Sequence, residues 1–118
     1  MFPKRSKYGN VRTHGFDSKG EYERYLILRD KERRGEISGL TRQVPYQLIP
    51  DLRDDNGKLL FKGIVYKADF TYWKDGKFVV EDFKGVKTKE YRIKQKLLYY
   101  FYHLTITESG KGKYGRNT

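Results

Sequence analysis

The sequence contains no cysteine and only two histidines, His14 and His103, among its 118 residues. The absence of cysteine excludes disulfide bonds, thiolate zinc sites and cysteine nucleophiles. The two histidines are far apart in the chain, so they can build neither a zinc finger nor the active site of an HNH-type nuclease. Any metal chemistry of this protein must therefore rest on oxygen ligands.

Long apolar runs are also missing. No stretch of 18 or more apolar residues is present, which argues against a transmembrane helix. The first residues, Met-Phe-Pro-Lys-Arg, lack the apolar core of a secretory signal, and no Walker-type glycine loop occurs. We expect a soluble protein that works in the cytoplasm without a membrane partner.

Positive charge is in large excess, with 26 Lys and Arg against 15 Asp and Glu and a net charge of +11. So much charge on a small body is self-repelling, which favours a polyanionic partner. Nucleic acid is the first candidate for that partner. An anionic membrane surface comes second, and packing within a ribosome-like assembly comes third.

Length and aromatic content predict one folded domain over residues 16–108, since aromatics reach 16% of the chain. Residues 1–15 and residues 109–118 contain cations but no acid, so we expect them to be flexible basic arms. The cations of the first arm are Lys4, Arg5, Lys7 and Arg12.

Capping residues, turn signals and periodicity predict an α/β or α+β fold in the order helix, three-strand antiparallel meander, helix, strand. The first helix begins after Ser18 and ends at Gly35. The expected strands cover 43–49, 61–73, 78–84 and 105–108, with hairpin turns at Asn56-Gly57 and Asp75-Gly76, and Thr88 caps the second helix.

The same patterns predict which faces are buried. A stripe of period two in the third segment, Ile64, Tyr66, Ala68, Phe70 and Tyr72, should line one face of the sheet. In the second helix the buried face should carry Ile93, Leu97, Phe101 and Leu104. We expect the aromatic run at 99–102 to belong to the core and its rim.

Two aspartates are predicted to face each other across the Asp75-Gly76 hairpin. A two-residue loop pairs residues whose numbers sum to 151, which places Asp69 opposite Asp82 with their Cβ atoms about 4.5–5.5 Å apart. Like charges so close repel, unless a shared proton or a divalent cation lies between them. Oxygen ligands alone suit a hard ion such as Mg²⁺ or Mn²⁺.

Strand alternation adds a lysine to this pair. Lys84 lies two residues after Asp82 and should share its face, whereas Glu81 and Phe83 should point the other way. Two acids and a lysine on one sheet face are what metal-assisted phosphodiester hydrolysis requires. Glu81 could compete with Asp82 for the ligand role, but only Asp82 shares a face with Lys84.

These residues resemble the PD-(D/E)XK nuclease signature: Ala68-Asp69-Phe70, a gap, then Asp82-Phe83-Lys84. The wider text, with Phe16-Asp17-Ser18-Lys19-Gly20-Glu21 and Val79–Gly85, resembles small phage-encoded endonucleases of that superfamily, which are allied to Holliday-junction resolvases. The resemblance spans about residues 8–104. It implies a restriction-endonuclease-like core.

The resemblance also implies roles for individual residues. Asp69 and Asp82 would bind the metal, the carbonyl of Phe83 would complete its shell, and Lys84 would be the catalytic lysine. Glu21 matches an acidic ligand on the first helix. Alanine replaces the signature proline at position 68, and Asp82 replaces the more usual glutamate. Gln95 and Tyr99 have a spacing seen in exonuclease relatives, although a plain polar helix position is the simpler interpretation of Gln95.

We therefore predict a Mg²⁺- or Mn²⁺-dependent DNA endonuclease that prefers branched DNA and works as a homodimer, within phage recombination or replication. A non-catalytic nucleic-acid-binding module is the alternative, and an RNA-directed nuclease is a third possibility. Besides the N-terminal arm, the expected phosphate contacts are Lys87, Lys89, Arg92, Lys94 and Lys96.

Overall fold

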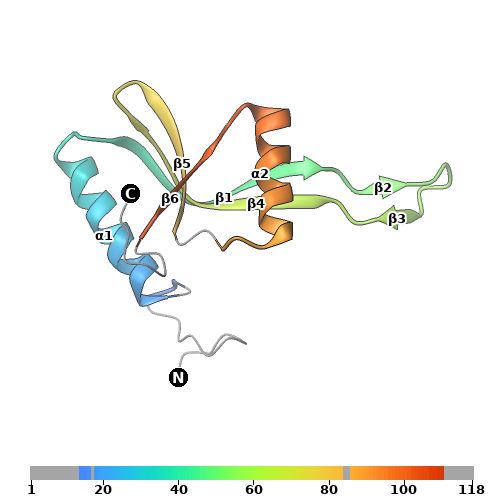
Figure 1. Ribbon diagram of the computed structural model, residues 1–118, viewed down its shortest axis with the longest axis horizontal. Helices are drawn as coiled ribbons and strands as arrows, with labels where there is room; N and C mark the ends of the chain where they lie inside the picture. Colours follow the sequence, from blue (N-terminus) through green and yellow to red (C-terminus); the bar gives the residue numbers. More distant parts are fainter. Residues whose placement is uncertain (1–13, 17, 84–85, 111–118) are drawn as a thin grey trace.

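The protein has a mixed α+β fold, as the sequence predicts (Figure 1). The computed structural model describes residues 14–16, 18–83 and 86–110. The elements in chain order are α1 (Lys19–Arg33), β1 (Ser38–Ile49), β2 (Leu52–Arg53), β3 (Leu59–Phe61), β4 (Ile64–Lys74), β5 (Lys77–Phe83), α2 (Lys89–Tyr102) and β6 (Ile106–Ser109). No helix in this part of the chain is long and apolar enough to cross a membrane.

The main sheet has the strand order β1-β4-β5-β6. The first three strands form an antiparallel meander, and β6 pairs with β5 in parallel after the crossover through α2. Strands β2 and β3 form a separate small hairpin that extends the β1–β4 ladder beyond α2 (Figure 1). The helix, meander, helix, strand order expected from the sequence is thus confirmed.

Both helices begin at the predicted caps. The Ser18 hydroxyl accepts a hydrogen bond from the Glu21 amide at 3.1 Å, and the Thr88 hydroxyl accepts one from the Tyr91 amide at 3.0 Å. His103 ends α2 in the left-handed region, with φ at 56°. The helix starts predicted from the capping residues are therefore confirmed.

Strand boundaries differ from the prediction at three places. β1 begins at Ser38 rather than at residue 43. The long segment 61–73 divides into β3 and β4 around Gly63, where an added Cβ would lie 2.3 Å from the carbonyl oxygen of Ile49. Ser109, expected in the flexible tail, is a buried residue of β6. The described part of the domain therefore reaches Gly110, whereas the two basic arms fall almost wholly outside the described residues.

The core consists of two clusters, so the predicted stripe on β4 is buried or partly buried as expected but is wrong in part, because its members are divided between the two clusters. Tyr66 and Ala68 pack with α2, whereas Phe70 and Tyr72 belong to the cluster beside α1. The buried side chains of β4 change from the α2 cluster to the α1 cluster at Asp69. Its neighbour across the ladder is Gln43, which has a left-handed φ of 52° and lies between the pairs Arg42–Phe70 and Val44–Ala68.

The predicted buried face of α2 is also wrong in part. Ile93 and Phe101 are about half exposed, whereas Tyr91 and Leu98 are the buried residues of the helix. Leu97 and Leu104 do pack against the core. The buried face is instead centred on Leu98 and on the amphipathic side chain of Tyr91, whose hydroxyl donates to Glu108.

Candidate active site

The β4–β5 ladder has the predicted register. Trp73 lies opposite Phe78, and Phe70 lies opposite Glu81 at the end of the regular pairing. The regular pairing ends there, one position short of Asp69 and Asp82, so the two aspartates are not a pair of this ladder. The carboxylate of Asp69 accepts a hydrogen bond from the backbone amide of Phe83 at 2.8 Å, which ties the two strand ends together.

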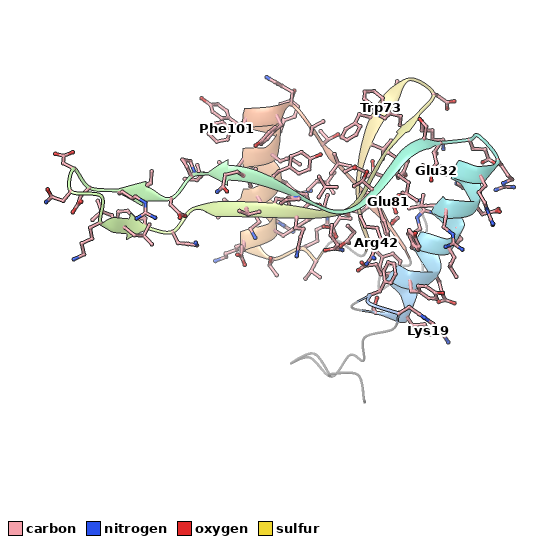
Figure 2. All side chains as sticks on the ribbon, turned by 180° about the vertical axis from the view of Figure 1, so that it is seen from behind. Lys19, Glu32, Arg42, Trp73, Glu81 and Phe101 are labelled. Carbon is pink, nitrogen blue, oxygen red and sulfur yellow. The ribbon has the colours of Figure 1, made fainter. Side chains whose placement is uncertain are left out.

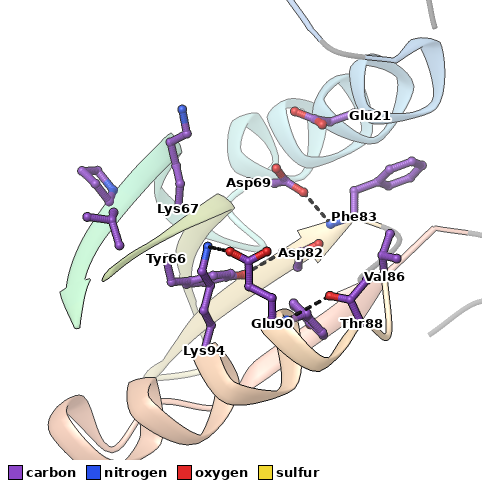
Figure 3. Close-up of a pocket in the computed structure, with 13 residues that line it drawn as sticks. Glu21, Tyr66, Lys67, Asp69, Asp82, Phe83, Val86, Thr88, Glu90 and Lys94 are labelled. Atoms are coloured by element: carbon purple, nitrogen blue, oxygen red, sulfur yellow. Dashed lines mark hydrogen bonds and ion pairs between the residues drawn. The ribbon is translucent and has the colours of Figure 1, made fainter. Parts of the chain in front are cut away.

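Asp69 and Asp82 both open onto one pocket of about 800 Å³ (Figure 3). Glu21 from α1 and Phe83 from β5 also line it, so all four predicted metal-site residues meet there. Residues of α2 and the segment before it close the other side. Three elements that are distant in sequence therefore converge on the acids at the end of the sheet.

Gln43 connects the two acids nearest α1. Its side-chain amide nitrogen donates to Glu21 Oε2 at 3.2 Å and to Asp69 Oδ1 at 3.4 Å. Gln43 makes these contacts with its backbone in the left-handed region, which is unusual for a strand residue. An amide donor shared by two carboxylates lowers their mutual repulsion and sets the spacing between α1 and β4.

Asp82 lies on the other side of the pocket in a more apolar environment. Burial raises the pKa of Asp82, and the nearby carboxylates of Glu108 and Glu81 raise it further, against the hydrogen bond from Tyr66 and the charge of Lys87. The Tyr66 hydroxyl donates to Asp82 Oδ2 at 2.9 Å. Burial and this carboxylate raise the pKa of Tyr66 above its ordinary value, so the phenol remains a hydrogen-bond donor.

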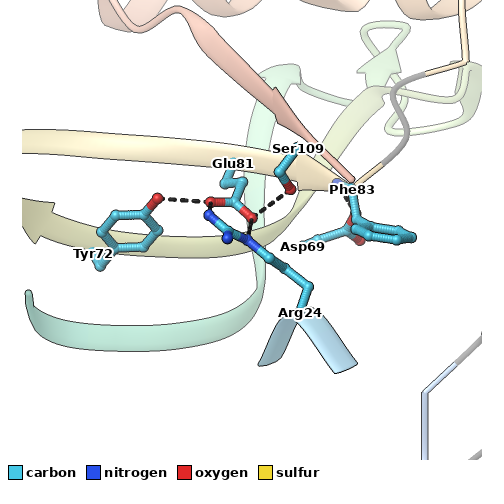
Figure 4. A network of polar contacts seen from close by, with 6 residues as sticks. All are labelled: Arg24, Asp69, Tyr72, Glu81, Phe83 and Ser109. Atoms are coloured by element: carbon cyan, nitrogen blue, oxygen red, sulfur yellow. Dashed lines mark hydrogen bonds and ion pairs between the residues drawn. The ribbon is translucent and has the colours of Figure 1, made fainter. Parts of the chain in front are cut away.

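Glu81 points to the opposite face of the sheet, as strand alternation predicts (Figure 4). It is fully buried and accepts hydrogen bonds from both Arg24 Nε at 2.7 Å and Arg24 Nη2 at 2.9 Å. The hydroxyls of Tyr72 and Ser109 donate to it at 2.6 and 2.5 Å. Glu81 is therefore committed to joining α1, β4, β5 and β6, and Asp82 is the acid that remains at the pocket.

The ring of Phe83 fixes how close α1 and the end of β6 come to β5. An added Cβ at Gly20 would lie 2.8 Å from the ring, and one at Gly110 would lie 2.4 Å from it. Both glycines therefore let the backbone approach the aromatic ring closely. This packing places the backbone of Phe83 beside Asp69.

The expected phosphate-binding lysines and arginine divide into three groups. Lys87 forms an ion pair with Glu108 and lies over the Tyr91 ring. Lys94 lines the pocket and pairs with Glu90 at 3.5 Å. The remaining cations, Lys89, Arg92 and Lys96, are exposed. Lys84 and the four arm cations, Lys4, Arg5, Lys7 and Arg12, lie outside the described residues.

The donor set of the pocket suits a hard divalent ion, since it offers carboxylate oxygens without sulfur or imidazole. Nevertheless, in the described part of the chain no three His, Cys, Asp or Glu side chains are arranged to hold one ion together. Asp82 bonds to Tyr66, and Asp69 bonds to the Phe83 amide. The ligand set of Asp69, Asp82, Glu21 and the Phe83 carbonyl therefore stays a prediction.

Comparison with known proteins places the chain in a family. Residues 5–113, nearly the whole sequence, match a family described as protein of unknown function (DUF1064). The chain belongs to the DUF1064 family. No curated protein and no solved structure matches it.

Two polar contacts to the acids of this DUF1064 protein are not predicted by its sequence. Tyr66 was assigned to an apolar stripe, although its hydroxyl reaches Asp82. The only sequence signal for this contact is that Tyr66 lies in the same expected strand as Asp69, close to the acid pair. Gln43 had none, because its contact depends on a left-handed backbone that no glutamine motif predicts.

Proposed function

We propose that this protein is a divalent-metal-dependent endonuclease that hydrolyses phosphodiester bonds in DNA. The observation that carries the proposal is the convergence of Asp69, Asp82 and Glu21 on one pocket. The presence of two strand aspartates at one pocket also agrees with the resemblance to PD-(D/E)XK nucleases. Nothing in the comparisons bears on this activity, so the proposal rests on geometry and on that resemblance.

Each acid has a distinct part in the proposed site. Asp69 and Asp82 would hold Mg²⁺ or Mn²⁺, with Glu21 and the Phe83 carbonyl as further ligands. A bound divalent ion would lower the pKa of a water molecule and neutralise charge on the phosphate. Tyr66 keeps the Asp82 carboxylate oriented, and Gln43 holds Glu21 and Asp69 at a fixed spacing. Lys84 would stabilise the negative charge that develops at the phosphate.

Basic side chains near the pocket favour a polyanionic substrate. Lys67 and Lys94 line the pocket itself, and α2 presents further exposed cations. Contacts to phosphate fix the register of a nucleic acid without reading its sequence. We therefore propose selection by DNA structure, with a four-way junction or a fork as the substrate. A junction has twofold symmetry and requires two cuts, which favours a homodimer.

The decisive experiment is a cleavage assay on four-way-junction, forked, linear duplex and single-stranded DNA, with RNA of the same sequences alongside. Each substrate is incubated with Mg²⁺, Mn²⁺ or EDTA. The wild type is compared with Asp69→Asn, Asp82→Asn, Glu21→Gln and Lys84→Ala. We expect cleavage only with metal, with a loss of at least 100-fold in both aspartate variants and unchanged DNA binding.

Two variants control for the general removal of negative charge. Asp55→Asn alters an exposed acid in the β2–β3 turn, and Glu23→Gln alters an exposed acid on α1 two residues from Glu21. Both should cut as the wild type does. If the wild type binds every DNA substrate and cuts none with either metal, the nuclease proposal fails and a binding module remains.

A further inference from the structure

The outer face of α2 carries exposed aromatic rings next to exposed cations. Tyr99 is 55% exposed and Tyr100 is 74% exposed, although the sequence placed the aromatic run 99–102 in the core and its rim. Neighbouring exposed aromatic rings form the kind of surface patch that marks an interaction site. Figure 2 shows that Phe101 also lies at this outer end of the helix.

Helical spacing places these rings and the cations on one side. At 3.6 residues per turn, Lys89, Arg92, Lys96, Tyr99 and Tyr100 fall within an arc of about 100°. The buried residues of the helix, Tyr91 and Leu98, lie well outside this arc. We refer to the five residues, together with the cap residue His103, as the α2 stripe.

The C-terminal half of the α2 stripe is hollowed rather than flat. Gln95, Lys96, Tyr99, Tyr100 and His103 line a shallow depression there. The His103 ring meets the Tyr99 ring edge to face, with centroids 5.7 Å apart, so these two rings support each other. The depression is therefore bounded by π-faces and by a lysine.

Charge on the helix points to the chemistry of the partner. The only acid of α2 is Glu90, which is paired with Lys94 on the side of the pocket. The α2 stripe consequently contains three cations and no acid. A partner that fits it carries repeated negative charge and flat rings, which describes a nucleic-acid strand with unpaired bases.

The N-terminal end of α2 lies beside the candidate active site, but the residues of α2 that line the pocket, Glu90, Tyr91 and Lys94, are on the side of the helix opposite the stripe. Thr88 and Tyr91, at the start of α2, line the acidic pocket, while the aromatic depression lies two turns further along the helix. A strand held on the stripe would reach Asp69 and Asp82 by passing round the start of α2. In a duplex the bases are stacked on one another and present no free face to tyrosine.

We propose that the α2 stripe binds single-stranded DNA, with Lys89, Arg92 and Lys96 contacting phosphates and Tyr99, Tyr100 and His103 stacking against unpaired bases. This inference rests on the proposed function insofar as both take DNA as the partner. It goes further by naming the unpaired segment of a branched or forked DNA as the part that the protein recognises away from the pocket.

The test separates base stacking from phosphate attraction. Binding of the full-length protein is measured by fluorescence anisotropy in EDTA, so that no strand is cut. The probes are a labelled 15-nucleotide single strand, a strand of the same length made of abasic units, and a duplex. The abasic strand keeps the charge and lacks the rings, so only stacking distinguishes it from the ordinary strand.

We expect the wild type to bind the ordinary strand at least tenfold more tightly than the abasic strand. The Tyr99→Leu/Tyr100→Leu variant should lose that preference and bind both strands equally. Its affinity for the duplex should stay within twofold of the wild type. Lys96→Ala should weaken binding of both strands by a similar factor, because it removes charge and no ring.

Matched controls keep the result interpretable. Trp73→Leu removes another half-exposed aromatic ring, at the β4–β5 hairpin, and should preserve the preference for bases. Equal wild-type affinity for the ordinary and abasic strands would overturn the stacking proposal and leave the nuclease proposal standing. Absence of binding to all three probes would overturn the single-strand proposal, whereas the nuclease proposal is tested separately by the cleavage assay on branched DNA. If the Tyr99→Leu/Tyr100→Leu variant loses the preference for bases but still cleaves DNA, the stacking surface and the candidate active site are shown to act separately.

Discussion

Adjacent residues Glu81 and Asp82 have opposite surroundings, and this difference divides structural from functional roles at the end of β5. Glu81 is completely buried among Arg24, Tyr72 and Ser109. Asp82 is partly accessible and opens onto the pocket. Conservative substitutions at the two positions should therefore affect different properties, stability at the first and activity at the second.

Glu81→Gln should lower the free energy of unfolding by about 3–5 kcal/mol, because it leaves the Arg24 guanidinium without its buried counter-charge. The side chain of Arg24 is 19% exposed, so a value near 3 kcal/mol is expected. Urea unfolding followed by circular dichroism measures the change. Asp30→Asn, which removes an exposed partner of Arg33 and Arg34, is the control and should cost at most about 1 kcal/mol. Equal effects of the two substitutions would contradict the assigned role of Glu81.

The two acids should also give opposite pH dependence. Burial raises the pKa of Glu81, but hydrogen bonds from Arg24, Ser109 and Tyr72 outweigh it and lower the pKa below the ordinary value of 4.5. The stability it contributes is then present above about pH 4.5 and is lost as the pH falls through the lowered pKa. The difference in unfolding free energy between wild type and Glu81→Gln should therefore shrink on acidification.

Asp82 has a raised pKa, so its ionisation costs stability once the pH rises above the ordinary value of 3.8. Asp82→Asn should be more stable than the wild type at pH 7 and should lose this advantage at about pH 3. Thermal unfolding across this pH range measures both differences. A pH-independent offset for either variant would show that its effect does not come from ionisation.

Gln43 should behave unlike an ordinary strand residue because its φ is 52°. A residue with a Cβ pays about 1–2 kcal/mol in the left-handed region, and glycine does not. Gln43→Gly should therefore be more stable than Gln43→Ala by about 1 kcal/mol, although both lose the bridge to Glu21 and Asp69. At Gln47, a β1 residue whose φ is not positive, the order should reverse, with alanine the more stable by about 0.5–1 kcal/mol. The same order at both positions would contradict the left-handed assignment.

At the scale of residues, the acid pair could be predicted and its polar partners could not. The Asp75-Gly76 turn sets the register of the hairpin as far as the Phe70–Glu81 pair, and Asp69 and Asp82 lie just beyond the paired residues. The contacts of Gln43 depend on its left-handed backbone, in a ladder between strands that are distant in sequence. No local pattern reports such an irregularity, so this part of the site required the structure.

At the scale of elements, the packing of α1 and β6 against β5 depends on the Phe83 ring. Gly110 has a φ of 82° and lies against that ring, whereas Gly57 has a similar φ of 85° with nothing nearby. Gly57→Ala should therefore cost only the backbone strain, about 1–2 kcal/mol. Gly110→Ala should cost about 1–3 kcal/mol more, because the added methyl group overlaps the ring.

A second substitution tests the cause of that difference. Phe83→Leu removes the ring atoms that an added Cβ would meet, so the extra cost of Gly110→Ala should largely disappear in the Phe83→Leu background. Chemical denaturation of the four proteins of this double-mutant cycle measures the coupling. Additive effects, with no coupling, would show that the ring does not set the spacing.

Element order and helix starts were predictable because they depend on local signals, such as Ser18, Thr88 and the glycine turns. The buried face of α2 could not be predicted in the same way, since apolar residues recur with helical spacing on more than one face of this helix. Ile93 and Phe101 form an apolar row as regular as the one that is actually buried. Only the position of the helix over β1 and β4 decides between the two rows, and that position is a property of the tertiary fold.

At the scale of the whole molecule, the net charge of +11 is distributed unevenly. The candidate active site gathers acids, and the outer face of α2 gathers cations beside aromatic rings. An acidic pocket alone would repel a phosphate backbone. In the proposed arrangement the basic outer face of α2 would offset this repulsion and hold the strand, while the acids would remain available for a metal ion.

The salt dependence of single-strand binding tests whether the position of the charge or its total amount governs affinity. Each phosphate contact on a single strand contributes about −0.7 to the slope of log K against log salt concentration. Lys89→Gln/Arg92→Gln/Lys96→Gln should therefore reduce the magnitude of the slope by about 2. Anisotropy titrations in EDTA over a range of salt concentrations measure it.

The control removes the same charge elsewhere. Lys58→Gln/Lys74→Gln/Lys77→Gln neutralises three exposed lysines at the tips of the two hairpins, and both triple variants have the same net charge. If the α2 stripe holds the strand, the control keeps the wild-type slope, since its lysines release no counterions on binding. If the two triple variants give equal slopes, affinity follows total charge, and the cations of α2 have no special role.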